Sequence, residues 1–196
     1  MTYPKILQIG SGREFKAEWL NLDMDGTWSP DLVVDISKPL PAEPLPSDRF
    51  GSVSLLPGGF DEIVAFDVLE HIPDMVTAMT NCLVLLREDG VMKIKVPYDL
   101  SLGAWQDPTH VRAFNENSFH YYCEWFWYLG WEDHRFHKQR IDLMPSEFGQ
   151  SLVDEGRLID EVARTPRAID AVYAELVKRP LTDQDRVELA RFRSRG

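Results

Sequence analysis

The chain has 196 residues, of which 44% are hydrophobic and 11% aromatic, and it carries a formal net charge of −11 at pH 7. This composition is typical of a globular protein with a substantial core and excludes a disordered chain. The acidic balance opposes nonspecific binding to nucleic acid or to anionic membranes, because Lys and Arg provide most phosphate contacts. We therefore expect no nucleic-acid and no membrane partner.

Neither a membrane span nor a secretion signal is expected. No apolar stretch approaches the roughly 20 residues that cross a bilayer. The N-terminal segment MTYPKILQIG lacks the charged lead and long apolar segment of a signal peptide. Cys82 and Cys123 both fall in expected helices, so no disulfide framework is expected. These features predict a cytoplasmic protein.

Five short apolar segments predict strands, and most of them end on a glycine or a carboxylate: KILQI (5–9), WLNLD (19–23), DLVVD (31–35), DEIVAFD (61–67) and GVMKIKVPY (90–98). Apolar runs of this kind are typical of parallel strands that are buried on both faces. Ligands bind at the carboxyl ends of such strands, so the polar groups there are candidate site residues.

Two helices are expected between and after these strands. Apolar residues spaced along one face predict a helix over 75–86, which Asp89-Gly90 ends, and a second helix is predicted over 116–130. WEDHRF (131–136) and KQRIDLM (138–144) predict a hairpin. A strand, a helix and a strand in succession require a right-handed crossover, so the sheet is expected to be mostly parallel with an antiparallel last strand.

Two connections depart from a regular α/β pattern. Only ten residues separate Gly12 from Asp23, which is too few for a helix and a strand. Residues 37–60 form a long proline-rich connection, and such connections are typically functional lids or mobile segments.

The C-terminal part of the chain is expected to be helical. Helices are predicted over 151–164 and 165–179, the second with Thr165 as N-cap and Pro166 at its first position, and a third after Thr182. The apolar stripe within 169–177 must be buried either on its own domain or on a second copy, and the second alternative would give a homodimer through the C-terminal helices. The chain thus divides into a domain over residues 1–149 and a helical extension over residues 150–196.

The glycine turn Gly10-Ser11-Gly12 after the first strand lets a ligand approach the backbone closely. A dinucleotide fingerprint has a third glycine and an acid about 20 residues further on, whereas Asp23 follows here after ten residues. The spacing therefore disfavours a nicotinamide-dependent reductase, and a purely structural turn is an alternative.

ILQIGSG, WLNLDMD, DLVVDISKPLP, FDEIVAFDVLEHIPD and LREDGVMKIKVPY, in this order, resemble a class I S-adenosylmethionine-dependent methyltransferase. More closely, they are similar to a compact bacterial subgroup with a shortened first helix. The resemblance covers roughly residues 5–145. It implies an α/β Rossmann-like fold and S-adenosylmethionine as cofactor. The usual third glycine position is occupied by Glu14, so the pocket is expected to be more open or to be closed by residues 37–60, and weakened or lost binding is a further alternative.

The resemblance also implies roles for single residues. Those expected against the cofactor are Gly10 and Gly12 at its methionyl and ribose portion, Asp23 at the ribose hydroxyls, Asp35 and Ile36 near the adenine, and Asp67, Val68 and His71 at the methionine end. Each carboxylate also has a structural alternative: a turn residue at Asp23, a cap at Asp35, and an N-cap at Asp67. Glu70 is expected to be a surface residue at a helix start.

A second polar cluster lies in WQDPTHVRAFNENSF, residues 105–119. His110 is the candidate general base, with His71 as the second choice, because imidazole titrates near neutral pH. Trp105, Asp107 and Arg112 are the candidate acceptor-binding residues. The alternative is a self-bonded loop in which Asp107 pairs with Arg112. The five histidines show no helical i, i+4 pair with acid support, so no metal site is predicted.

These features predict methyl transfer from S-adenosylmethionine to an oxygen or nitrogen nucleophile of a small-molecule or glycan-type acceptor. The alternative is a non-catalytic methyltransferase-like module, with the C-terminal helices as its interface.

Overall fold

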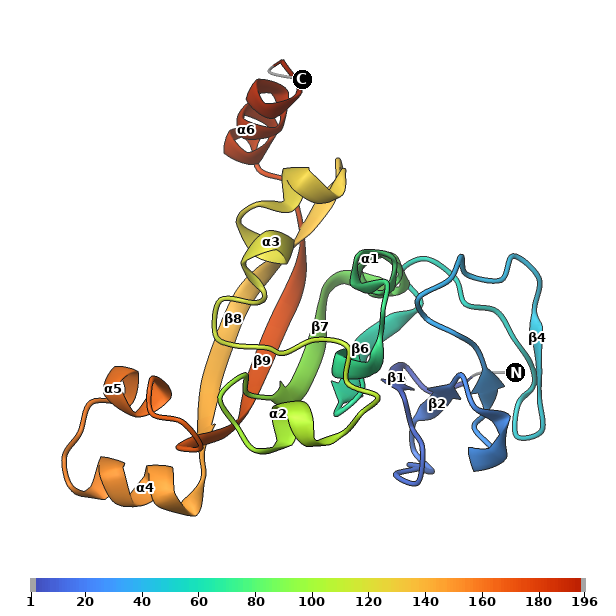
Figure 1. Ribbon diagram of the computed structural model, residues 1–196. Helices are drawn as coiled ribbons and strands as arrows, with labels where there is room; N and C mark the ends of the chain where they lie inside the picture. The colour runs from blue at the N-terminus through green and yellow to red at the C-terminus, as the bar shows by residue number, and fades with distance from the viewer. Residues whose placement is uncertain (1–2, 195–196) are drawn as a thin grey trace.

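A mixed sheet organises the chain, in the strand order β3-β2-β1-β6-β7-β9-β8 (Figure 1). The computed structural model describes residues 3–194. The strands of the sheet are β1 (Ile6–Ile9), β2 (Leu20–Asp23), β3 (Leu32–Val33), β6 (Phe60–Phe66), β7 (Leu86–Pro97), β8 (His134–Pro145) and β9 (Ile169–Pro180). Strands β1, β2, β3, β6 and β7 are mutually parallel, and β9 is antiparallel to both of its neighbours. The five predicted strands and the mostly parallel sheet are confirmed.

The strand order reverses between β1 and β6. From β1 the chain proceeds outward through β2 and β3, and it then returns to place β6 and β7 on the other side. In β1, Ile9 pairs with Ala65 of β6 and with Leu22 of β2, so these three strands end level with one another. Such a reversal leaves a crevice at the carboxyl ends of the strands. The glycine turn and two strand-end carboxylates, Asp23 and Asp67, lie at this edge.

Helix α1 (Met75–Leu85) confirms the helix predicted over 75–86. The Asp74 side chain caps it by accepting a hydrogen bond from Thr77 N, and Ala78 and Met79 are fully buried on its inner face. The remaining helices are η1 (Gly26–Trp28), η2 (Leu69–His71), α2 (Gly103–Gln106), α3 (His120–Cys123), η3 (Phe126–Leu129), α4 (Glu147–Asp154), α5 (Ile159–Ala163) and α6 (Asp183–Arg193). Helix α6 confirms the helix predicted after Thr182, whose side chain forms a capping box with Asp185.

The single helix predicted over 116–130 is wrong, because α3 and η3 are two short segments separated at Trp125. The backbone N–H of Trp125 donates to His120 O, five residues back, and the Trp125 ring packs against Tyr121. Aromatic residues lose side-chain freedom in a helix, so this aromatic-rich segment has little intrinsic tendency to continue one.

The helix predicted over 165–179 is also wrong. Residues Ile169–Pro180 form β9, which is inserted between β7 and β8. Val172, Ala174 and Leu176 are fully buried and alternate along the chain as the residues of a strand do. Pairing of this segment with β7 on one side and β8 on the other outweighs the helical spacing of its apolar residues. A wholly helical extension over 150–196 is therefore wrong. The dimer stays a prediction, without this stripe as its basis.

The hairpin predicted over 131–144 is a single strand, β8, with an irregularity between Lys138 and Arg140. The partner that the hairpin would have provided is β9, which pairs along the whole of β8. The second half of the sheet is therefore antiparallel, and its last three strands are much longer than β1–β3 (Figure 1).

The sheet carries helices mainly on one face. In β7, Met92, Ile94 and Val96 are fully buried against the core that includes α1, while the lysines between them are half-buried. On that second face polar side chains pair across the strands: Lys93 with Glu62, Lys95 with Asp67, and Tyr173 with Glu175. An alternating strand with one solvated face is typical of mixed and antiparallel sheets, so burial of β7 on both faces is not observed.

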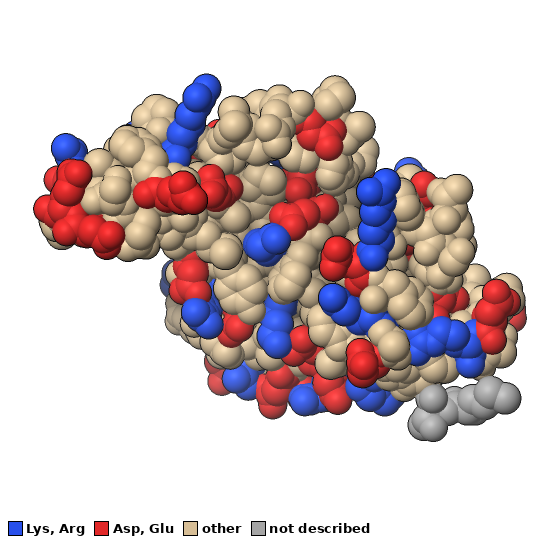
Figure 2. Space-filling view, turned by 90° about the horizontal axis from the view of Figure 1, so that it is seen from below, with Lys and Arg blue, Asp and Glu red and all other residues tan. Residues whose placement is uncertain are grey.

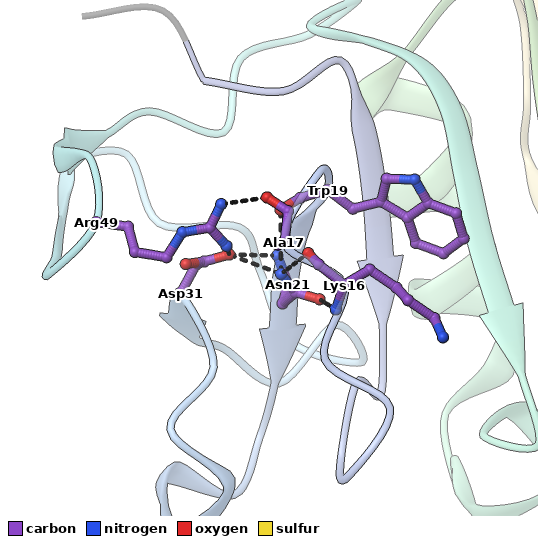
Figure 3. A network of polar contacts seen from close by, with 6 residues as sticks. All are labelled: Lys16, Ala17, Trp19, Asn21, Asp31 and Arg49. Carbon is purple, nitrogen blue, oxygen red and sulfur yellow. Dashed lines mark hydrogen bonds and ion pairs between the residues drawn. The ribbon is translucent and has the colours of Figure 1, made fainter.

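The short connection between β1 and β2 is held by Asn21, which is fully buried in β2 (Figure 3). Its Nδ2 donates to Lys16 O at 2.9 Å and to Trp19 O at 3.0 Å, and its Oδ1 accepts from Lys16 N at 2.9 Å. These bonds replace the hydrogen bonds that a helix would make in this segment. The buried amide thus allows β2 to follow the glycine turn after a short loop.

Asp31 and Arg49 complete this network. The Asp31 Oδ2 atom accepts from both Asn21 N at 2.8 Å and Asn21 Nδ2 at 2.9 Å, and from Arg49 Nη1 at 3.1 Å. Arg49 lies between β4 (Leu45–Ser47) and β5 (Gly51–Val53), a hairpin within the long 37–60 connection. The guanidinium also donates to Ala17 O, so the hairpin is tied to the loop before β2.

Asn21→Asp should destabilise the protein by about 3 kcal/mol or more, because it places a second carboxylate against buried Asp31 and removes two donors. Urea unfolding measures the change. The matched control is Asn117→Asp, an exposed site where a change within about 0.5 kcal/mol is expected. Equal stability of the two variants would contradict this account.

Truncation after Gly149 should abolish cooperative unfolding, since it removes β9 and leaves β7 and β8 without their shared partner. Truncation after Leu181, which removes only α6, should retain a cooperative transition at a lower Tm. Circular dichroism during heating distinguishes the two. A cooperative transition in the shorter chain would show that residues 1–149 fold without β9.

Candidate cofactor and acceptor site

A cavity of about 730 Å³ lies where the strand order reverses, a volume within the range of small-molecule sites. It is lined by residues from the ends of β1, β2, β6 and the segments that follow them. Of the residues predicted to contact a cofactor, those that line it are Gly10, Asp23, Asp35, Ile36, Asp67, Val68 and His71. Their roles in binding stay predictions. Trp28 and Thr109 also line it, whereas none of its described lining residues comes from the 37–60 connection.

Gly10 permits the closest contact in this cavity. Its φ is +64°, and a Cβ built on it would lie 2.4 Å from Val68 Cγ2, well inside van der Waals contact. Only a residue without a side chain lets the turn after β1 lie against the turn after β6. Gly12 has φ +44° but faces open space, with no atom within 4 Å of its would-be Cβ.

Asp23 orders the glycine turn as well as lining the cavity. Its Oδ2 accepts from Gly12 N at 2.8 Å and its Oδ1 from Asp25 N at 2.9 Å. Gly12 therefore acts on the cavity through Asp23 and is not itself among its lining residues. Asp35 likewise caps the turn that follows it. Its Oδ1 accepts from Ser37 N at 2.9 Å and from Ser37 Oγ at 2.6 Å. The turn role of Asp23 and the cap role of Asp35 are therefore both observed, and both residues also line the cavity.

Asp67 has a left-handed backbone, with φ 52°, where β6 turns into η2. Its carboxylate pairs with Lys95 Nζ at 2.7 Å and is half-exposed. It does not cap η2, whose N-cap residue is Val68, so the N-cap alternative for Asp67 is wrong. The Asp67 carboxylate thus lies between the cavity, which it lines, and the polar face of the sheet, where it pairs with Lys95.

Glu70 is almost fully buried, at 2% exposure, so its expected surface position is wrong. Burial raises the pKa of Glu70 to about 7, and the nearby charge of Asp67 adds to the rise. Its Oε2 atom is buried and has no hydrogen-bond partner among residues 3–194. A buried carboxylate without a partner is unusual and calls for an explanation.

The two histidines predicted as general bases lie side by side, with ring centroids 4.6 Å apart. His110 Nδ1 lies 2.9 Å from Ala104 O, which can only accept, so Nδ1 carries the proton. His71 Nδ1 lies 2.9 Å from Thr109 Oγ1, whose single proton goes to Asp107 Oδ1 at 2.7 Å. His71 Nδ1 therefore also carries the proton. In the neutral form of each ring, this network leaves Nε2 without a proton.

The loop over residues 105–119 is tied to η2 and to the segment between η2 and α1. Val111 N donates to Glu70 O at 2.9 Å, and Arg112 Nη2 donates to Ile72 O at 2.8 Å and to Pro73 O at 2.6 Å. The alternative pair of Asp107 with Arg112 is therefore wrong, because Arg112 bonds to main-chain carbonyls. Trp105 is 65% exposed at the carboxyl edge of the sheet, and its role toward an acceptor stays a prediction.

No family model and no curated protein matches the sequence. Solved structures do resemble the fold. A SAM-dependent methyltransferase from Archaeoglobus fulgidus aligns over 90% of this chain and 86% of its own, at 18% identity and a TM-score of 0.58. An S-adenosylmethionine-dependent methyltransferase from Mesorhizobium loti aligns over 89% and 90%, at 12% identity and a TM-score of 0.53.

A 16S rRNA adenine methyltransferase from Catenulisporales acidiphilia aligns over 92% of this chain and 87% of its own, at 11% identity and a TM-score of 0.50. This chain has the class I methyltransferase fold. The predicted Rossmann-like fold class is thereby confirmed. At these identities the likeness establishes the fold alone, and the compact bacterial subgroup stays a prediction.

A second cavity of about 360 Å³ adjoins the first in this methyltransferase fold and shares Asp67 with it. Its other walls include Lys95 at the end of β7, Met144 at the end of β8 and Asp170 at the start of β9. Asp170 was not predicted as a site residue, because its segment, residues 165–179, was predicted to be a helix. Only the antiparallel pairing of β9 brings Asp170 beside Asp67.

The charges at this end of the methyltransferase fold are mixed. Seen from below Figure 1, acidic and basic side chains alternate over the ends of the sheet, and acidic residues gather on the α4–α5 lobe (Figure 2).

In residues 3–194 no helix is long and apolar enough to pass through a bilayer.

Gly10→Ala should destabilise the protein by about 2–5 kcal/mol, the sum of a left-handed backbone cost of about 1–2 kcal/mol and an overpacking cost of about 1–3 kcal/mol. Gly12→Ala is the matched control and should incur only the backbone cost. Urea unfolding measures both. Val68→Ala in the Gly10→Ala background should restore part of the loss, and equal costs for the two single variants would contradict the contact.

Proposed function

We propose that this protein transfers a methyl group from S-adenosylmethionine to an oxygen or nitrogen atom of a small-molecule or glycan-type acceptor. One observation carries this proposal: Asp23, Asp35 and Asp67 line a single cavity at the reversal of strand order, beside a glycine turn that a Cβ would obstruct. The fold supports it, because ligands of open α/β sheets bind at this position.

The polar groups suit this cofactor. When bound, S-adenosylmethionine supplies a methyl group on a sulfonium cation, and its ammonium group adds a second positive charge, which acidic walls favour. Asp23 and Asp35 each keep unused lone pairs for hydroxyl or amino donors. Gly10 leaves the turn after β1 without side-chain bulk.

We place the acceptor beside Asp67, between the second cavity and the histidine pair. The bound cofactor would supply its methyl group to an acceptor lone pair, and the electrons of the broken carbon–sulfur bond would remain on sulfur. The acceptor proton would pass to a base, and we assign this role to the Nε2 atom of His110 or of His71. Holding both partners in line can itself supply several kcal/mol of barrier lowering.

The surface around the site supports a small acceptor over a polyanion. The α4–α5 lobe beside the second cavity is rich in acidic residues, and basic residues over the sheet end are interspersed with acids (Figure 2). A long phosphate backbone would require a continuous basic surface.

Calorimetric titration with S-adenosylhomocysteine tests the proposal. Wild-type protein should bind one equivalent, and Asp35→Asn should weaken binding about ten- to hundredfold, the effect of losing a hydrogen bond to a charged group. Asp35 is preferable to Asp23, because both oxygens of Asp23 hold backbone N–H groups, at Gly12 and Asp25, whereas only Oδ1 of Asp35 does, at Ser37. Asp48→Asn, an exposed acid of the β4–β5 hairpin, is the matched control.

Absence of heat and of any thermal shift at millimolar ligand would overturn the enzyme and favour a non-catalytic methyltransferase-like module. In that outcome, the hydrogen bonds already made by Asp23 and the Glu14 in place of a third glycine would explain the loss of binding.

A further inference from the structure

Glu70, His71 and His110 each offer one ligand atom, and these atoms all lie within 4.8 Å of one another. The three side chains come from two segments, the η2 turn after β6 and the loop before α3. Glu70 is the buried member, at 2% exposure, and its Oε2 atom is without a hydrogen-bond partner in the described chain. The cluster therefore includes a residue with an acceptor atom that residues 3–194 leave unsatisfied.

The two rings are already held as metal ligands require. A histidine that binds a metal through Nε2 typically donates its Nδ1–H to a carbonyl or carboxylate, which sets the tautomer and the ring plane. His110 donates Nδ1–H to Ala104 O, and His71 donates to Thr109, which in turn donates to Asp107. Both bare Nε2 atoms are thus available without any rearrangement of protons.

We propose that Glu70, His71 and His110 bind one divalent first-row transition-metal ion. Two imidazole nitrogens and one carboxylate are a ligand set found for Zn²⁺ and for non-haem Fe²⁺, in both cases with coordination positions left for water or substrate. Mg²⁺ and Ca²⁺ prefer all-oxygen sites, so the set selects against them. The ion would also compensate the negative charge that Glu70 and nearby Asp67 bring into this region.

This site was not predicted from sequence, because its histidines do not have the i, i+4 spacing of a pair on one helix. The ligands here are two adjacent residues and a third from a loop that follows β7. The main-chain bond between Val111 N and Glu70 O, at 2.9 Å, brings that loop to η2.

The position of the cluster assigns the ion a function. His71 and Thr109 line the cofactor cavity, so an ion on the cluster would lie at the edge of that cavity. This edge is next to the position that we propose for the acceptor. An acceptor hydroxyl that occupied an open position would have its pKa lowered by the ion, which would replace the histidines as the means of deprotonation. This part rests on the proposed function and narrows the acceptor to an oxygen nucleophile; binding of the ion does not rest on it.

Titration of EDTA-treated protein with Zn²⁺ and with Mg²⁺, followed by calorimetry, tests the site. One equivalent of Zn²⁺ should bind, with Mg²⁺ much weaker. Glu70→Gln and His110→Ala should each weaken Zn²⁺ binding at least tenfold, and Thr109→Val, which removes no ligand, should weaken it about tenfold through the orientation of His71. His134→Ala is the matched control, since His134 also faces a glutamate, Glu88 at 3.3 Å, outside the cluster.

Nuclear magnetic resonance of ¹⁵N-histidine-labelled wild-type protein provides a readout that does not depend on variants folding. The free protein should show His71 and His110 as Nδ1–H tautomers, and Zn²⁺ should shift their Nε2 resonances but not those of His134. No Zn²⁺ binding, unchanged binding in Glu70→Gln and His110→Ala, or shifts confined to His134 would each overturn the proposal. S-adenosylhomocysteine binding by the same EDTA-treated protein separates this failure from failure of the proposed function.

Discussion

The contact between Gly10 and Val68 is the constraint on which the site depends. Strands β1 and β6 are parallel neighbours, and the turns that leave them must separate because one leads toward β2 and the other toward α1. A would-be Cβ at Gly10 lies 2.4 Å from Val68, so the turns meet only because that atom is absent. Both residues line the cavity that the strand-end carboxylates also line.

A buried polar network supports the same region from the other side. The amide of Asn21 satisfies the backbone of the short loop before β2, and Asp31 links it to Arg49 of the β4–β5 hairpin (Figure 3). Because each member is paired, the network orders a segment that has no helix of its own. The glycine turn thus remains in place although the connection after it is short.

The insertion of β9 determines the other half of the site. It places a strand from late in the sequence between β7 and β8, which makes that half of the sheet antiparallel and brings Asp170 to the carboxyl end of β7. The loop over 105–119 is held to η2 by the main-chain bond from Val111 N to Glu70 O. Two cavities and a histidine–carboxylate cluster therefore converge on Asp67 and the turn that follows it.

The sequence by itself determined the features that depend on neighbouring residues. The glycine turn, the carboxylates at the ends of β2 and β6, the capped helix α1 and the capping box of α6 all rest on local periodicity, turn residues or caps. Only the tertiary structure decided the rest. Residues 169–177 fit both a helical and a strand period, and pairing with two distant strands selected the strand. The burial of Glu70, the pairing of His71 with His110 and the second cavity likewise depend on contacts between segments far apart in the chain, which no local pattern encodes.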